Sequence, residues 1–489
     1  MKTNVLFLPF HLPRSRCKAR SAQQILAEEI QQLKQKSFSQ LGECLGKFIP
    51  GRHLHPASSG ALSRRRIYSK ENTFWAFLSQ VLDADGGCKE VVRKLQAFAA
   101  LKLDKQPSSS TAAYCKARQK LDQVTLESIL KHTAEGIHAV ADSDRLNGRR
   151  VIVVDGTGIS MPDTEENQYK WPQYKSQKPG CGFPQAAICA CFNLYNGTLI
   201  SHEVGNKKSH ELPMLRKQWD TFKPGDIFLG DKGFCSYYDQ SSLKDRGVDS
   251  VITLARRMPV SEVEAVKVLG EDDLLIQWKK PARRQKLSSY SQEDLEGLPE
   301  TLLLRQIKVT VKQPGFRVTS FHIITTLLDA EKYPTSEIAD LYFQRWDVEL
   351  FFRDIKTTMG MDILRCKTPE MVTKEILMHL IAYNCIRRLM LEAANKKSVT
   401  LRRISFKGSV QALRQWEPHL NQGKMSRDDR TRLIRLLTDS IAGNIAPDRP
   451  GRSEPRAVKR RPKNYQRLNK PRHEMKEIQQ RSKYRAEKA

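Results

Sequence analysis

Two aspartates stand where short apolar runs of the sequence end. Asp155 follows the run VIVV in VIVVDG, and Asp231 follows IFLG in DIFLGDKGF. Each run predicts a β-strand, and a carboxylate at the C-terminal end of such a strand can meet others over the same edge of an α/β sheet. Taken singly, either aspartate also fits a turn or a helix cap.

A third acid lies in a stretch that predicts a helix ending at Gly360. At intervals of 3, 4 and 7 residues this stretch carries Tyr342, Arg345, Glu349 and Lys356. At about 100° per residue the four side chains fall within an arc of about 60°, so one helix face presents an acid, two cations and a phenol. Aromatic residues on both sides of Glu349 favour a buried helix, in which an acid usually has a partner. The alternative is a solvated face with ion pairs between successive turns.

Three carboxylates on separate elements predict a site for two divalent metal ions. Mg²⁺ takes oxygen ligands and keeps positions open for phosphate and water. Two such ions, roughly 3.5–4 Å apart, can activate an attacking oxygen and stabilise the leaving oxygen of an in-line phosphoryl displacement. The two cations beside Glu349 would hold the phosphate.

The three motifs together resemble the DDE transposases of bacterial insertion sequences, in the group with a Tyr-x2-Arg-x3-Glu-x6-Lys signature. The first-acid motif Asp-Gly-Thr is matched by Asp155–Thr157, and the second, Asp-x-Gly-Phe, by Asp231–Phe234. The intervals between the acids, 76 residues (155 to 231) and 118 residues (231 to 349), are similar to those of members with a β-strand insertion before the final helix. The resemblance covers about residues 110–470.

The resemblance implies a ribonuclease-H-like core in which the three acids bind two Mg²⁺ ions, with Mn²⁺ as a substitute. Such an enzyme hydrolyses the 3′ ends of its mobile element and joins the 3′ hydroxyls to target DNA. The other signature residues would grip phosphates near the cleaved end. Implied partners are the element's terminal inverted repeats and target DNA, with a homodimer forming when two ends are synapsed. The implied location is the bacterial cytoplasm, associated with the nucleoid through DNA.

The strand before the signature helix departs from one family pattern. Members implicated in a hairpin intermediate often carry a Trp there, which traps a flipped base. Here the strand reads TSFHIITT, with Phe321 and His322 at that place. Phe321 could still stack on a base.

Two further features could contact DNA. The segment YKWPQYKSQKPGCGF interleaves aromatic residues, among them Trp171, with lysines, and such a loop can stack bases and bind the backbone. A structural loop over the sheet is the alternative. The predicted helix 112–121 carries Lys116 and Arg118 and is a candidate recognition helix, or else an ordinary capped helix of a bundle.

The composition favours a nucleic-acid partner. The 489 residues include 83 Lys and Arg against 54 Asp and Glu, a net charge of +29. The excess gathers at the ends: 15 against 4 over residues 449–489 (net +11) and 13 against 3 over residues 1–70 (net +10). An acidic polymer is the expected partner. Because no apolar run approaches the roughly 18 residues that a membrane span needs, the sequence predicts no membrane partner.

The chain therefore predicts an α/β protein in three parts. Residues 1–147 form a helical N-terminal DNA-binding region, with helices expected at 22–35 and 71–84. Residues 148–445 form the catalytic domain, with a β-rich insertion at about 256–320. Residues 446–489 form a basic, poorly ordered tail.

Two other function classes remain open at this stage. One is a ribonuclease-H-like, structure-selective DNA nuclease, which predicts nicked DNA without joined products. The other is a non-catalytic DNA-binding protein derived from a transposase, although all three acids and the signature are present.

Overall fold

The computed structural model describes most of the chain outside its two ends. It covers residues 41–56, 58–63, 66–101, 106–135, 146–206, 210–254, 263–281, 293, 296–311, 319–420, 426–447 and 468–475. The helix expected at 22–35 and most of the expected tail lie outside these residues.

A single mixed sheet forms the centre of the fold. Its strand order, within the described residues, is β3-β2-β1-β4-β5-β9-β8-β7-β6. The β1–β4 and β4–β5 pairs are parallel, and every other pair is antiparallel. The strands are β1 (Val151–Ser160), β2 (Gln185–Asn193), β3 (Leu199–Asn206), β4 (Ile227–Gly230), β5 (Asp249–Thr253), β6 (Val263–Gly270), β7 (Asp273–Lys279), β8 (Thr301–Val311) and β9 (Thr319–Thr325).

The strands in the middle of the sheet are apolar along their length because both faces of the sheet are covered there. Alternate residues of β1 belong to different cores: Val151 and Val153 to one, Ile152 and Val154 to the other. A strand buried on both faces reads as a continuous apolar run, which is what VIVV and IFLG are. The helices α8 (Glu211–Arg216) and α9 (Tyr237–Asp245) share the core of Ile152.

The second and third strands form a β-hairpin. Strands β2 and β3 pair antiparallel, and Gly197 adopts a φ of +67° in the connection between them. Only glycine takes this left-handed conformation without strain. The Asn196–Gly197 pair therefore suits this connection.

The region expected as a β-rich insertion, residues 256–320, supplies β6, β7 and β8, and these strands together with β9 continue the same sheet in antiparallel pairs. Strand β9 pairs with β5, as Ile252↔Ile324 shows. It thereby satisfies backbone groups that would otherwise be an open edge of the central strands. The extension is anchored by a fully buried guanidinium, because Arg305 on β8 bonds to Asp273 on β7 (Nε–Oδ1 2.8 Å) and to the carbonyl of Tyr333 (2.7 Å), just before the signature helix.

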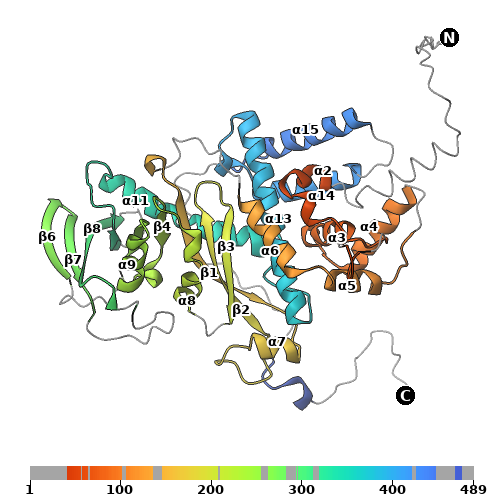
Figure 1. Cartoon of the computed structure of the whole chain (residues 1–489), viewed down its shortest axis with the longest axis horizontal. Coiled ribbons are helices and arrows are strands. Elements are labelled where there is room, and N and C mark those ends of the chain that lie inside the picture. The colour runs from red at the N-terminus through yellow and green to blue at the C-terminus, as the bar shows by residue number, and fades with distance from the viewer. Residues whose placement is uncertain are drawn as a thin grey trace, which may run out of the picture.

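The N-terminal helices pack against those of the C-terminal part. In Figure 1 they lie at the opposite end of the molecule from β6–β8, with α13 between them and the sheet. Helices α3 and α6 contact α13, and α15 packs on α13 from the other end of the chain. The helices of these parts are α2 (Leu41–Leu45), α3 (Lys70–Leu82), α4 (Cys88–Leu101), α5 (Ala112–Gln119), α6 (Gln123–Ala134), α13 (Pro369–Lys397), α14 (Phe406–Leu420) and α15 (Arg427–Gly443). The short helix α7 (Glu165–Lys170) lies between β1 and β2 in the chain.

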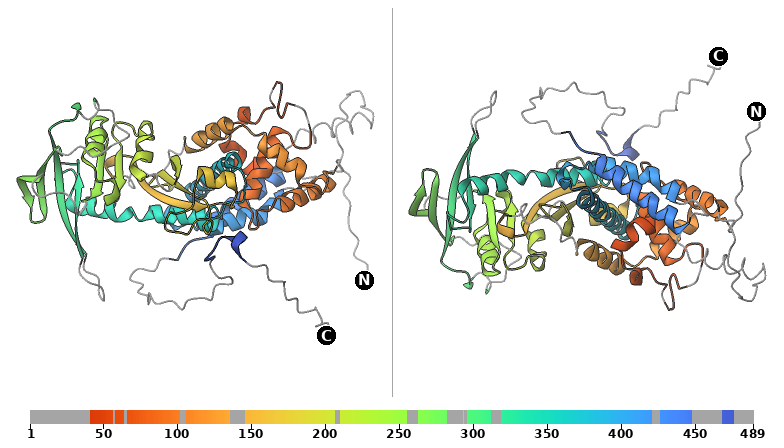
Figure 2. Two further views of the ribbon diagram at one scale, coloured as in Figure 1. Left: turned by 90° about the horizontal axis from the view of Figure 1, so that it is seen from below. Right: turned by 90° about the horizontal axis from the view of Figure 1, so that it is seen from above.

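The helical path that carries the signature runs from the β6–β9 end of the sheet towards these helices (Figure 2). It consists of α11 (Thr335–Gln344), α12 (Asp347–Arg353) and a π-helical turn, η8 (Asp354–Thr358). Among the described residues, no helix combines the length and apolar character needed to cross a membrane.

Candidate active site

The pairing of β1 with β4 brings the two aspartates to the same level. Val151 lies beside Ile227 and Val153 beside Leu229, in parallel. Continuing that register by two residues sets Asp155 beside Asp231, on chains about 4.8 Å apart. The register of β1 against β4 therefore brings the two acids together at one edge of the sheet, as expected.

Only one of the two aspartates ends its strand. Asp231 follows the last residue of β4, as predicted, whereas β1 continues past Asp155 to Ser160. The prediction that a strand ends at Asp155 was wrong, because β1 remains paired with β2 there (Asp155↔Ala190) after β4 has stopped. Asp155 thus has a paired strand on one side and an unpaired side towards Asp231.

Glycines next to each aspartate hold the carboxylates in place. The Gly156 N–H donates to Asp155 Oδ1 at 2.7 Å, and the Gly233 N–H donates to Asp231 Oδ1 at 2.7 Å. A Cβ at position 156 would lie 2.0 Å from the carboxylate of Glu211. The Asp-Gly and Asp-x-Gly motifs are therefore local hydrogen-bonding units in which a side chain at Gly156 would displace a neighbour.

The signature helix is not the single α-helix that the spacing predicted. At the joint between α11 and α12 the backbone bonds span three residues, as in Arg345 N–H to Tyr342 O (3.0 Å) and Glu349 N–H to Trp346 O (3.2 Å). Beyond Arg353 the path widens into the π-helical turn. The expected arc of about 60° assumed one uniform pitch, so it does not describe this tightened and then widened path. The predicted end is confirmed, since Gly360 takes a φ of +79°.

Two signature side chains reach the central strands. The Tyr342 hydroxyl hydrogen-bonds with Thr253 Oγ1 at the end of β5. Lys356 Nζ donates to Thr157 Oγ1 at 3.0 Å, and Thr157 belongs to the Asp-Gly-Thr motif of β1. These contacts fix the helix to β1 and β5, the two neighbours of β4 in the sheet.

Arg345 is the buried cation of the site. Its residue is 7% exposed, and the guanidinium lies 4.4 Å from the Trp346 ring and 5.8 Å from that of Tyr342. Among the described residues its Nε has no hydrogen-bond partner. Most buried donors have a partner, so Arg345 Nε is an exception in this part of the structure.

The other two acids and Arg345 act electrostatically on Asp155. Burial raises the pKa of the Asp155 carboxyl, and the negative charges of Asp231 and Glu349 raise it further. The Gly156 N–H and Arg345 oppose this rise. Glu349 itself is exposed, so the expected buried acid is wrong: the helix buries Val348, Phe351 and Phe352 and leaves Glu349 at the surface.

The donor set suits a hard divalent cation. Carboxylate oxygens are the ligands of Mg²⁺, and a cation between Asp155, Asp231 and Glu349 would relieve the mutual repulsion that raises the pKa of Asp155. Among the described residues, no three His, Cys, Asp or Glu side chains already lie together as a metal-binding cluster. The three acids therefore fit a divalent cation by the chemistry of their oxygen donors and by their negative charge.

The predicted DNA-contacting residues have different surroundings. Phe321 is half-buried beside the signature helix, with its ring 5.6 Å from that of Tyr342. Trp171, by contrast, is 3% exposed and belongs to the main core. It cannot stack on a base in this conformation, and its place in a base-stacking loop was wrong because the ring is needed for packing. Its neighbour Tyr169 is 93% exposed.

The candidate recognition helix also has a buried member. Arg118 is 8% exposed, donates to Gln80 Oε1 at 3.0 Å, and lies 4.8 Å from the Phe77 ring. It therefore joins α5 to α3, so its predicted DNA contact is corrected to a structural one. Lys116 on the same helix is exposed.

Sequence reasoning missed two residues that shape the site. Thr157 anchors Lys356, and the third position of the Asp-Gly-Thr motif was the available signal for it. Glu211 lies against Gly156 from α8. No sequence pattern indicated that contact, because it depends on how α8 packs on the sheet.

Comparisons with known proteins agree with this geometry. A family model described as "Transposase DDE domain" matches residues 146–385, a range that contains the three acids and the whole signature. The chain is 26% identical over 436 residues, 88% of its own length and 93% of the relative's, to the transposase InsG for insertion sequence element IS4 of Escherichia coli (strain K12). It is 20% identical over 289 residues, 51% of its own length and 60% of the relative's, to the transposase for insertion sequence element IS231F of Bacillus thuringiensis subsp. israelensis. The resemblance to the DDE transposases of bacterial insertion sequences is thus confirmed, and residues 146–385 form the transposase DDE domain of this chain.

Proposed function

We propose that this transposase excises its element by cutting at both ends and joins the freed 3′ hydroxyls to target DNA. The observation that supports this most directly is the pKa of Asp155, which is raised by burial and by both other acids and lowered by Arg345. One site thus combines three oxygen donors with a buried cation that has an unused N–H. That combination suits phosphoryl transfer.

Asp155, Asp231 and Glu349 are proposed to hold the divalent metal ions that transposases with this domain use, with two Mg²⁺ expected. Bound there, such ions would polarise the scissile phosphate and lower the pKa of the attacking water or hydroxyl. The hydrogen bonds from Gly156 and Gly233 keep one oxygen of each aspartate oriented, which lowers the cost of organising the site when a cation binds.

The remaining signature residues are proposed to position the DNA. Lys356, held by Thr157, places a positive charge at β1, and Arg345, held by two rings, directs its free Nε to a phosphate oxygen. Tyr342 is proposed to hold the helix at β5 and to support Phe321. Phe321 would stack on a base near the cleaved end.

The order of the first five strands supports a ribonuclease-H-like core. In β3-β2-β1-β4-β5 the first three strands are antiparallel and the last two parallel to β1. The strands β6–β8 would then be the insertion, and β9 the strand before the final helix. Residues 1–147 and 446–489 are proposed as flanking DNA-binding parts, with Lys116 as an exposed phosphate contact. The proposed assembly is a homodimer on two element ends.

A strand-transfer assay tests this function. The purified chain is incubated with Mg²⁺, a labelled duplex that ends in the element's terminal repeat, and a supercoiled plasmid. We expect labelled plasmid, because the 3′ hydroxyl is joined to it. Nicked or shortened duplex without labelled plasmid would instead indicate a nuclease that does not join, and intact DNA that is bound but not cut would indicate a non-catalytic binding protein.

A further inference from the structure

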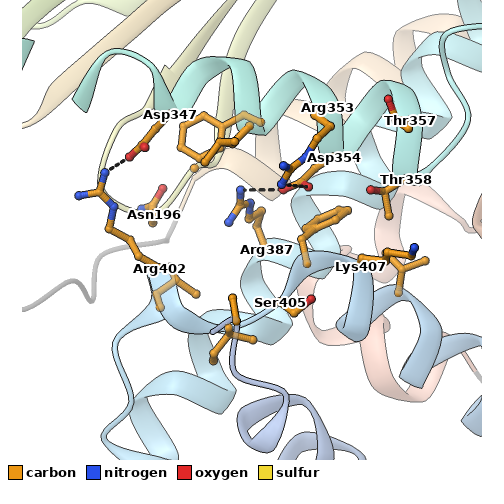
Figure 3. Close-up of a pocket in the computed structure, with 18 of the residues that line it drawn as sticks. Asn196, Asp347, Arg353, Asp354, Thr357, Thr358, Arg387, Arg402, Ser405 and Lys407 are labelled. Atoms are coloured by element: carbon orange, nitrogen blue, oxygen red, sulfur yellow. Dashed lines mark hydrogen bonds and ion pairs between the residues drawn. The ribbon is translucent and has the colours of Figure 1, made fainter. Parts of the chain in front are cut away.

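A cavity lies on the side of α12 that faces away from the signature residues. Its volume is about 530 Å³, and none of the four signature residues lines it. Figure 3 shows it between α12 with its π-helical turn and the helices α13 and α14. The β2–β3 connection, at Asn196, contributes to the wall.

The lining of this cavity is strongly basic. Against two acids, Asp347 and Asp354, it has five cations, a surplus of three. The cations are Arg353, Arg387, Arg402, Lys407 and Arg414. Such a surplus in a partly enclosed, low-dielectric space attracts an anion more strongly than the same charges would on an open surface.

Two of the arginines are already held in position. Arg387 is 8% exposed, lies 3.4 Å from Asp354 Oδ2, and packs over the Phe351 ring at 4.9 Å. Arg402 pairs with Asp347 and donates to Gln344 Oε1 at 3.1 Å. Because these guanidinium groups are fixed before any ligand arrives, little side-chain entropy is lost on binding.

Two other cations reach the solvent. The Arg353 side chain is 61% exposed, although it lies 3.8 Å from Asp354, and Lys407 is exposed. In Figure 3 both border the cavity from opposite walls, Arg353 from α12 and Lys407 from α14. They are therefore placed to meet a ligand that enters.

The rest of the lining indicates what kind of anion fits. Thr357, Thr358 and Ser405 bring hydroxyl groups, and apolar side chains such as Leu350 and Val410 complete the wall. A bare inorganic anion would contact only the polar part of this wall. A sugar-phosphate backbone can contact both parts, because its phosphates accept from charged and hydroxyl donors while its sugars and bases contact apolar surface.

We propose that this cavity binds the backbone of the DNA substrate, so that the substrate is held on both sides of the signature helix. The position assumes, as in the proposed function, that the scissile phosphate lies beside Glu349. An α-helix with its side chains is about 10–12 Å across, and the phosphates of one strand advance about 3.4 Å per nucleotide along the axis of the duplex, which is taken to run across α12. The phosphate in the cavity is therefore roughly three or four nucleotides from the scissile one.

Binding measured without divalent metal tests this inference apart from cleavage. The double variant Arg353→Gln/Lys407→Gln is compared with a control, Lys223→Gln/Lys244→Gln, whose residues are exposed and lie next to the amino ends of β4 and β5. For duplex DNA, each lost phosphate contact reduces the slope of log K against log salt by about 0.9. We expect the cavity variant to lose nearly two units of slope and the control none. Equal slopes for the two variants would overturn the proposal.

A neutral methylphosphonate, moved one position at a time along the substrate, locates the contact. In the wild type we expect a drop in affinity when it lies three or four nucleotides from the cleavage site, on one side of it. The cavity variant should be insensitive at that position, because the contact is already lost. If the wild type shows no such position, or if wild type and variant lose affinity equally, the cavity does not bind the backbone. A variant that changes the dimerisation constant and leaves DNA affinity intact would assign the cavity to a second protein chain and likewise overturn the proposal.

Discussion

Lys356 donates a hydrogen bond to Thr157 at 3.0 Å, across 199 residues of sequence. The two belong to different motifs of the family, one at the end of the signature helix and one directly after the first acid on β1. The contact sets the end of the helix over the strand that carries Asp155. The motifs therefore depend on one another structurally as well as chemically.

Loss of the Thr157 hydroxyl should affect catalysis through Lys356. A hydrogen bond to a charged group contributes about 1.5–3 kcal/mol, so we expect Thr157→Val to slow single-turnover cleavage by about tenfold or more with an unchanged Kd for DNA. Lys356→Ala should be slower still. The double variant should be no worse than Lys356→Ala, since the threonine then has nothing to hold. Additive losses would show that the two residues act independently.

Each acid should be essential to cleavage and dispensable for binding. We expect Asp155→Ala, Asp231→Ala and Glu349→Ala each to reduce cleavage on the order of 10³-fold or more, with little change in affinity for element ends. Gel-based cleavage with Mg²⁺ and a binding titration measure the two effects. The matched control is Glu337→Ala, an exposed acid in the first turn of α11. An acid whose alanine variant cuts like the control is not part of the site.

Arg345→Lys keeps the charge and loses the planar guanidinium. That group lies over the Trp346 ring at 4.4 Å and presents several donors in one plane, which an ammonium cannot reproduce. We expect cleavage and joining to fall by about 10²-fold, because proximity and orientation supply much of the rate. Mn²⁺ binding, measured by calorimetry, should not change. Wild-type joining by this variant would mean that charge alone is sufficient at position 345.

The raised pKa of Asp155 predicts that this carboxyl lowers the stability of the folded protein at neutral pH, although cleavage requires it. A carboxyl whose folded pKa lies above its unfolded value binds protons more readily in the folded state. Stability therefore falls as the pH rises from the unfolded pKa through the folded one, and the deficit persists at neutral pH. We expect Asp155→Asn to raise the Tm of the metal-free protein at pH 7 and to abolish cleavage. The gain in Tm should vanish at about pH 3, where the wild-type carboxyl is also neutral. A variant that is less stable than the wild type at pH 7 would contradict this account.

Trp171→Ala should behave as a core substitution. Removing a buried tryptophan costs about 3–5 kcal/mol of unfolding free energy, and Trp171 is 3% exposed. We expect a lower denaturation midpoint with unchanged DNA affinity of the folded fraction. Tyr169→Ala, at 93% exposure, is the control and should leave stability unchanged. Normal stability with weakened DNA binding in Trp171→Ala would return this tryptophan to the DNA surface.

The sequence alone located what depends on short-range pattern. Buried strands appear as unbroken apolar runs, so β1 and β4 and their acids could be placed, and Gly360, which has a positive φ, marked the end of the signature helix. What could not be predicted depends on tertiary pairing. The continuation of β1 beyond Asp155 exists because β2 is longer than β4, and strand lengths on a neighbour are not encoded locally.

The helix and the aromatic loop show the same limit. A constant 100° per residue cannot reveal the tightened joint at Arg345 or the π-helical turn at Asp354–Thr358. These follow from packing the helix against the sheet on one side and α13 on the other. Trp171 and Arg118 were assigned to DNA by residue type, whereas the core that surrounds them is assembled from distant segments.

Arg305 has a consequence for any attempt to build chimeras of this enzyme. Its buried guanidinium bonds to Asp273 within the β6–β9 extension and to the carbonyl of Tyr333 outside it. A transplant of strands from a relative that lacked either the arginine or the aspartate would leave one charge buried alone, at a cost of about 3–5 kcal/mol. The extension can therefore be exchanged only as a cassette whose boundaries take in Asp273, Arg305 and the segment that leads into α11.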